Sequence, residues 1–162
     1  MKKFLLTLLL ATIVAQPAFA EQIPATEMDN LDGEAMHFPA AFQGNPTLVI
    51  LAFAHEQREE AIRVMELLQK AHEANNALTW YELPIIDAPS VVHFFIRNGM
   101  SRRTDEAMHA HIVPQFVDDD EWHKSSGITG MEPLLAKVDH DGKILKSVPL
   151  SAVKTADDIT NF

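Results

Sequence analysis

The sequence predicts an α/β domain built around a mixed β-sheet, and three observations lead to that class. In the first half of the chain, continuous apolar segments alternate with a segment of helical periodicity, which requires crossover connections and parallel strands. A β-hairpin pattern near the C-terminus adds antiparallel strands. The composition, with 47% hydrophobic and 22% charged residues in a chain of 162, is that of one globular domain.

The first 30 residues are predicted to precede the folded domain. A basic start is followed by a short apolar run, residues 4–15, and by the triplet Ala-Phe-Ala, which is the pattern of a secretory signal peptide. The run is too short for a transmembrane helix, which needs about 20 apolar residues. We expect cleavage between Ala20 and Glu21, a flexible lead-in over 21–30, a domain over 31–162, and a periplasmic protein without a membrane-spanning segment.

Five elements are predicted in the first part of the domain. Residues 35–38 follow a turn signal and fit a short strand. Residues 47–54 form a continuous apolar run, typical of a strand covered on both faces. From residue 56 to about 75, apolar side chains recur every three or four positions, which predicts an amphipathic helix. A second strand is expected over 79–86 and a short helix over 89–98.

The second part of the domain is predicted to contain another strand, a short helix and a hairpin. Residues 112–117 fit a strand, and the acidic run that begins at Asp118 favours a helix start. That helix is expected to end at Gly127. Residues 134–148 read as two strands around a turn, and the tail after Thr155 fits a last helix.

One stretch of the second part resembles a known protein superfamily. Residues 127–142 read Gly-Ile-Thr-Gly-Met-Glu-Pro-Leu-Leu-Ala-Lys-Val-Asp-His-Asp-Gly. This is similar to the periplasmic thioredoxin-like and peroxiredoxin-like proteins, in which a Gly-Val/Ile element precedes a cis-proline, a strand and a D-x-D-G turn. Pro133 stands at the cis-proline position. The resemblance covers about residues 31–150 and implies a thioredoxin-like, three-layer α/β/α fold with a central mixed sheet.

A looser similarity runs from Trp80 to Asp139. The pattern of Tyr-x-Leu-Pro-Ile-Ile, then Phe-Phe-Ile-Arg-Asn-Gly-Met, then Leu-Leu-x-x-Val-Asp resembles the thioredoxin-like relatives of the mitochondrial ATP synthase assembly factor. That group is chaperone-like rather than redox-active. The similarity implies a role in binding other proteins.

The chain contains no cysteine. Redox members of the superfamily carry a Cys-x-x-Cys directly after the first core strand, but residues 55–57 of this chain are His-Glu-Gln. Because the thiolate is the nucleophile in disulfide exchange, thiol–disulfide oxidoreductase and thiol peroxidase activities are excluded. The resemblance implies that this loop faces the proline loop across a groove, where an extended peptide adds as a strand. The candidate groove residues are His55, Glu56, Gln57, Met131, Glu132 and Pro133.

Two other classes of function remain open from the sequence. One is a non-thiol enzyme or metal-binding protein that uses His55, or His109 together with His111. His123 lies near these in the chain, but no recognised metal-ligand spacing is met. The other is a periplasmic inhibitor or structural subunit that makes its contacts through residues 94–108. We expect no cofactor and predict no metal site.

The charge balance narrows the choice of partners. With 13 Lys and Arg against 23 Asp and Glu, the net charge is −10, which argues against nucleic-acid binding because that needs clustered basic residues. The sequence therefore predicts a redox-inactive periplasmic protein of thioredoxin-like type. We expect it to bind a protein or peptide partner, as a chaperone-type module does. The oligomeric state is left open.

Overall fold

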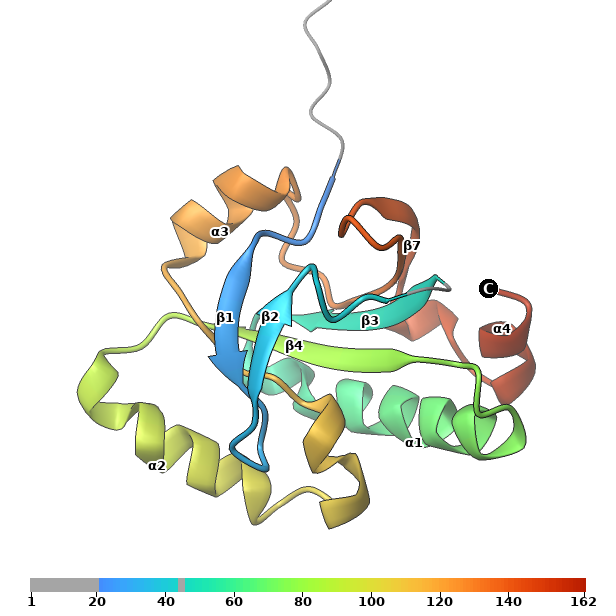
Figure 1. The fold of residues 1–162 in the computed structure, drawn as a ribbon, viewed down its shortest axis with the longest axis horizontal. Helices are drawn as coiled ribbons and strands as arrows, with labels where there is room; N and C mark the ends of the chain where they lie inside the picture. The colour runs from blue at the N-terminus through green and yellow to red at the C-terminus, as the bar shows by residue number, and fades with distance from the viewer. Residues whose placement is uncertain (1–20, 44–45) are drawn as a thin grey trace, which may run out of the picture.

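The computed structural model describes residues 21–43 and 46–162 (Figure 1). The predicted signal peptide lies outside these residues. The strands are β1 (Thr26–Asp29), β2 (Ala35–Phe38), β3 (Thr47–Ala52), β4 (Trp80–Ile86), β5 (Gln115–Phe116), β6 (Leu134–Val138) and β7 (Ile144–Pro149). The helices are α1 (Arg58–Ala74), α2 (Ser90–Ser101), α3 (Asp119–Ser126) and α4 (Ala156–Thr160). The 3-10 helices are η1 (His55–Gln57), η2 (Glu106–His111) and η3 (Leu150–Ala152).

The predicted mixed sheet is confirmed. The central sheet has the order β5-β4-β3-β6-β7, and a separate antiparallel pair is formed by β1 and β2. Strand β3 is parallel to β4 and antiparallel to β6, while β6 and β7 form the predicted hairpin. Helix α1 is the crossover that a parallel β3–β4 pair requires.

Strand β3 separates two hydrophobic cores because every one of its residues is buried. Leu48 and Ile50 pack into the cluster that contains the α1 residues Ala61 and Leu68. Val49 and Leu51 point the other way and belong to the cluster that contains Trp122 of α3 and Phe38 of β2. The sheet is therefore the middle of three layers, with α1 and α4 on one face and α3 with the β1–β2 pair on the other (Figure 1).

Helix α3 forms where its end signals predict it. The side chain of Asp118 accepts a hydrogen bond of 2.9 Å from the backbone N–H of Glu121, which is an N-cap contact. The helix ends at Gly127, whose φ of 75° is the left-handed conformation that glycine adopts at low cost. Both ends of this helix are thus determined by local sequence.

The expectation of a flexible lead-in over residues 21–30 needs correction. Residues 26–29 form β1, Ile23 is buried, and its backbone N–H donates to the carbonyl of Gly142 at 2.7 Å. Gly142 has a φ of +82°, and a Cβ there would lie 3.0 Å from the Cβ of Pro39. This close packing of the segment against the β6–β7 turn could not be seen from the polar composition of residues 21–30.

The expected cis peptide bond before Pro133 is not observed. Within the described residues, the cis peptide bond is Phe38–Pro39, after β2. The carbonyl of Pro133 accepts from the backbone N–H of Leu150 at 2.9 Å, directly before β6 begins. The position of the proline next to β6 agrees with the resemblance, but the isomer does not.

Helix α2 differs from the prediction in length and from the other helices in its packing. It was predicted to end at residue 98 but continues through Gly99 and ends at Ser101. None of its residues is buried. Its outward side carries Val91, Phe94 and Phe95, which are 78%, 71% and 69% exposed. In the described part of the chain, no helix is long and apolar enough to cross a membrane.

Candidate functional site

The loop that follows β3 is held by the side chain of Gln57. This side chain accepts hydrogen bonds from the backbone N–H groups of Phe53 at 2.7 Å and Ala54 at 3.3 Å. Its amide nitrogen donates to the carbonyl of Met131 at 2.6 Å. Gln57 thus links the turn after β3 to the loop before β6, while His55 and Glu56 are exposed beside it.

The second segment of the candidate groove consists of Met131, Glu132 and Pro133. Met131 is 49% exposed, Glu132 is exposed and Pro133 is buried. Among the described residues, neither the backbone N–H nor the carbonyl of Glu132 has a hydrogen-bond partner. The structure therefore brings Gln57 and Met131 into contact, and leaves one complete set of backbone hydrogen-bonding groups open next to that contact.

The side chain of His123 contacts the side chain of Met131. Its Nδ1 donates to the carbonyl of Ile128 at 2.8 Å, and its Nε2 lies 3.1 Å from the Sδ of Met131. The ring stacks on Phe53, with a centroid distance of 5.2 Å. These contacts give His123 a role in orienting Met131.

The other candidate histidines have structural contacts of their own. His109 is buried and donates through Nε2 to the carbonyls of Ser101 and Thr104, at 3.1 and 3.3 Å. The Nδ1 of His111 donates to the carbonyl of Trp80 at 2.9 Å, and its ring stacks on the indole at 4.4 Å. Burial lowers the pKa of His111, with the hydrogen bond to Trp80 opposing the shift.

These histidines do not come together as a ligand set. In the residues that the structure describes, no group of three or more His, Cys, Asp or Glu side chains is arranged to hold a metal ion. His55 lies at the end of β3, whereas His109 and His111 lie in η2.

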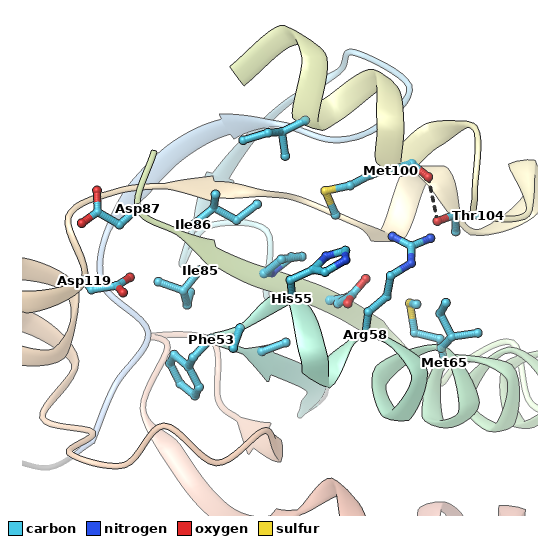
Figure 2. A pocket seen from close by; sticks show the side chains of 16 residues that line it. Phe53, His55, Arg58, Met65, Ile85, Ile86, Asp87, Met100, Thr104 and Asp119 are labelled. Atoms are coloured by element: carbon cyan, nitrogen blue, oxygen red, sulfur yellow. Dashed lines mark hydrogen bonds between the residues drawn. The ribbon is translucent and has the colours of Figure 1, made fainter. Parts of the chain in front are cut away.

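Behind the loop lies a cavity of about 370 Å³ that sequence reasoning did not find (Figure 2). It opens between α1, the end of β4 and α2. His55 and Arg58 line it from the loop and from the start of α1, and Ile96 and Met100 line it from α2. The walls are therefore a mixture of apolar side chains and a small number of charged ones, which is typical of ligand sites.

A buried carboxylate, Glu82, belongs to this cavity. Glu82 lies in the middle of β4, on the α1 side of the sheet, and is only 6% exposed. Its carboxylate oxygens are not among the fully buried side-chain atoms without a partner in the described part of the chain, so they keep contact with the cavity that Glu82 lines. Burial raises the pKa of Glu82 to about 7, and the positive charge of Arg58 opposes that rise. A single acid within the strand Trp-Tyr-Glu-Leu-Pro-Ile-Ile was the only sequence signal for it.

Two more carboxylates line the cavity, on the side away from Arg58. Figure 2 shows Asp87 and Asp119 close together there. The Oδ1 atom of Asp119 is buried without a hydrogen-bond partner. Burial and the neighbouring charge of Asp87 raise the pKa of Asp119. The cavity thus combines three acids with one arginine and one histidine.

Comparison with solved structures identifies the fold. The chain superimposes on the exposed lipoprotein thioredoxin Etrx1 of Streptococcus pneumoniae with a TM-score of 0.58, 15% identity, and coverage of 85% of this chain and 96% of that one. The chain has a thioredoxin-like fold. The expected three-layer thioredoxin-like architecture is therefore confirmed.

Two further thioredoxin-like structures are similar to this one. The thioredoxin domain of the thiol-disulfide oxidoreductase BVU-2223 of Bacteroides vulgatus gives a TM-score of 0.56 at 20% identity, covering 88% of this chain and 92% of that chain. BsSco, of the Sco family of cytochrome c oxidase assembly proteins, gives 0.57 at 13% identity, covering 88% and 91%. No family model and no curated protein matches this chain. At these identities the thioredoxin-like similarity concerns the fold alone.

Proposed function

We propose that this protein is a redox-inactive, thioredoxin-like binding module that holds an extended segment of a protein partner. The segment would add as a strand beside Glu132, in the groove between residues 55–57 and 131–133. The observation that carries the proposal is Glu132, an exposed residue whose backbone N–H and carbonyl are unpaired among the described residues. Strand addition uses such free backbone groups to bind peptides of varied sequence.

The bridge made by Gln57 supports a preformed site. Because Gln57 bonds both to the turn after β3 and to the carbonyl of Met131, it holds the two walls at a fixed separation. A site that is ordered before binding loses less conformational entropy when the partner arrives. By resemblance, redox members of the superfamily carry a Cys-x-x-Cys directly after this strand, where this chain has His55, Glu56 and Gln57.

The side chains around Glu132 favour a basic and apolar segment. The carboxylates of Glu56 and Glu132 are exposed, and the thioether of Met131 is half exposed between them and His123. The whole chain has a net charge of −10, which would attract a basic partner over a longer range. We therefore expect bound segments to be enriched in Lys, Arg and apolar residues.

A periplasmic location is part of the proposal. Its support is the signal-peptide pattern of the first 20 residues. Similar folds include a protein described as an exposed lipoprotein and another described as a secreted disulfide oxidoreductase. The test is the N-terminal sequence of the protein recovered from the periplasm, which we expect to begin at Glu21.

The binding proposal is tested with peptides selected from a random display library on the purified protein. Affinities are then measured for wild type, Glu132→Ala and Glu132→Pro. Alanine retains the backbone N–H, so we expect its affinity to remain within about threefold of wild type, whereas proline removes that donor and is expected to weaken binding at least tenfold. Thermal unfolding of both variants checks that they fold.

Charge reversal gives an independent arm of the same test. In Glu56→Lys, the backbone groups of Glu132 are untouched but one groove carboxylate becomes a cation. We expect Glu56→Lys to bind basic peptides more weakly than wild type does. We also expect its affinity for these peptides to depend less on the salt concentration. Equal affinities for wild type, Glu132→Pro and Glu56→Lys would exclude the groove as the binding site.

A further inference from the structure

We propose that the cavity between α1, β4 and α2 is a second binding site, and that it takes a small organic ammonium ion with an apolar body. The body would lie between the apolar side chains of α1 and α2, and the ammonium group would bind the carboxylate of Glu82. This site shares His55 of η1 with the proposed peptide groove, but none of residues 131–133 lines it.

The size and lining of the cavity fit such a ligand. Its volume of about 370 Å³ lies in the range of small-molecule sites. Ile62 and Met65 line it from α1, and Ile96 and Met100 line it from α2. These four side chains make up an apolar part of the lining, and two of them are methionines, which adapt readily to different shapes.

The carboxylate of Glu82 is the group in the cavity that favours a cationic ligand. Glu82 is 6% exposed and lines the cavity, and its carboxylate oxygens are not among the fully buried atoms without a partner in the described part of the chain, so they reach the cavity rather than being enclosed by protein. A buried polar group without a partner costs stability, and a buried charge costs more. An ammonium group would supply both the opposite charge and hydrogen-bond donors, so the ligand would offset a cost that the free protein bears.

The remaining charges of the cavity favour a cation over an anion. Asp87 and Asp119 line the same cavity, and Oδ1 of Asp119 is also buried without a partner. Of the basic groups, Arg58 already donates through Nη2 to the carbonyl of Arg103 at 3.0 Å, and it forms no salt bridge with Glu82. Three acids against Arg58 and His55 leave the cavity acidic (Figure 2).

Two sources of this ligand chemistry can be distinguished. A simple amine would use Glu82 alone, whereas an apolar amino acid would also place its carboxylate on the free donors of Arg58. The probes are therefore phenylethylamine, phenylalanine and the neutral analogue phenylethanol, titrated into the purified protein by calorimetry. We expect phenylethylamine or phenylalanine to bind at least tenfold more tightly than phenylethanol at pH 8.

Two variants test the assignment to this cavity. Glu82→Gln keeps the shape of the side chain and removes its charge, and should weaken binding of the charged probe at least tenfold. The matched control, Glu66→Gln, removes an exposed charge from α1 and should leave binding unchanged. Ile96→Trp fills the cavity from α2 and should abolish binding while Glu82 is retained.

Acidification gives a third readout. Glu82 is faced by Arg58 and His55 on one side, with Asp87 and Asp119 on the other. Because the pKa of Glu82 is about 7, the affinity for the ammonium probe should fall about tenfold from pH 8 to pH 6 as Glu82 becomes protonated. Glu82→Gln should show a smaller change over the same range.

The proposal is overturned if neither charged probe binds wild type at millimolar concentration. It is also overturned if phenylethanol binds equally well, or if Glu82→Gln retains full affinity for the charged probe. Since none of these variants alters Glu132 or Gln57, the outcome leaves the peptide-binding proposal to its own test.

Discussion

The proposed groove and the cavity share the short turn η1, yet the two would offer different kinds of recognition. The groove presents backbone groups of Glu132 on an exposed surface, held in place by Gln57. The cavity presents a side-chain carboxylate, Glu82, at a position that is 6% exposed. Every residue except proline has both backbone groups, so it is the fold that leaves those of Glu132 unpaired. A buried acid is a property of this sequence.

This difference indicates that the two regions depend on different parts of the chain. The groove geometry needs no thiol, because the amide of Gln57 links the two loops. The cavity depends on α2, a helix without a buried residue, whose inner side chains Ile96 and Met100 form one wall. We therefore expect that substitutions in the cavity leave peptide binding at the groove unchanged, and that substitutions in the groove leave ligand binding in the cavity unchanged.

The largest expected effect concerns Glu82. The pKa of Glu82 is raised from 4.5 to about 7 in the folded protein, so the folded state binds more protons than the unfolded state between these pH values. Stability therefore falls as the pH rises through this window. We expect Glu82→Gln to increase the free energy of unfolding at pH 8 by about 3 kcal/mol.

Urea unfolding at pH 5 and pH 8 checks this prediction. At pH 5, where folded Glu82 is protonated, the advantage of Glu82→Gln over wild type should shrink to about 1 kcal/mol or less. Glu66→Gln serves as the control, since Glu66 is exposed. A constant difference between Glu82→Gln and wild type at both pH values would show that burial of the charge does not determine the effect.

A smaller effect is expected at the bridge between the groove walls. Gln57→Ala leaves the backbone N–H of Phe53, which is buried, without its acceptor, and should cost about 2 kcal/mol. Gln57→Glu keeps an acceptor for that N–H but cannot donate to the carbonyl of Met131. Urea unfolding should therefore rank wild type, Gln57→Glu and Gln57→Ala in order of decreasing stability. Equal stability of Gln57→Ala and wild type would mean that the bridge does not stabilise the loop.

The smallest effect is expected on the outer side of α2. Phe95 is 69% exposed and contacts Phe94, with ring centroids 5.7 Å apart. Phe95→Ser should change the free energy of unfolding by no more than about 0.5 kcal/mol and should leave binding in the cavity unchanged. A large loss of stability in the isolated protein would show that this face packs against the rest of the chain.

The elements with local signals were predictable from sequence. The apolar run of β3, the capping Asp118 with the terminal Gly127 of α3, and the turn of the β6–β7 hairpin each carry their own pattern. The three layers followed from the alternation of strands and helices together with the resemblance. Helix α2 was predicted too short, because Gly99 is tolerated within a helix whose neighbours favour it.

Features that depend on contacts distant in sequence were not predictable. The polar segment before β1 is ordered by a distant contact, since the backbone N–H of Ile23 donates to the carbonyl of Gly142. The cavity arises where α2 lies over the end of β4, and Glu82 is buried only because of that arrangement. In sequence, an acid within a strand is equally compatible with an exposed face. Pairing and burial are properties of the assembled fold.

The most direct test of the binding account is amide hydrogen exchange at Glu132, measured by NMR with and without a selected peptide. Glu132 is an exposed residue and its amide has no partner among the described residues, so the amide should exchange rapidly in the free protein. If a peptide adds as a strand, this amide donates to it, and its exchange should slow at least tenfold. A peptide that binds tightly while the exchange of Glu132 stays as fast as before would contradict strand addition at the groove.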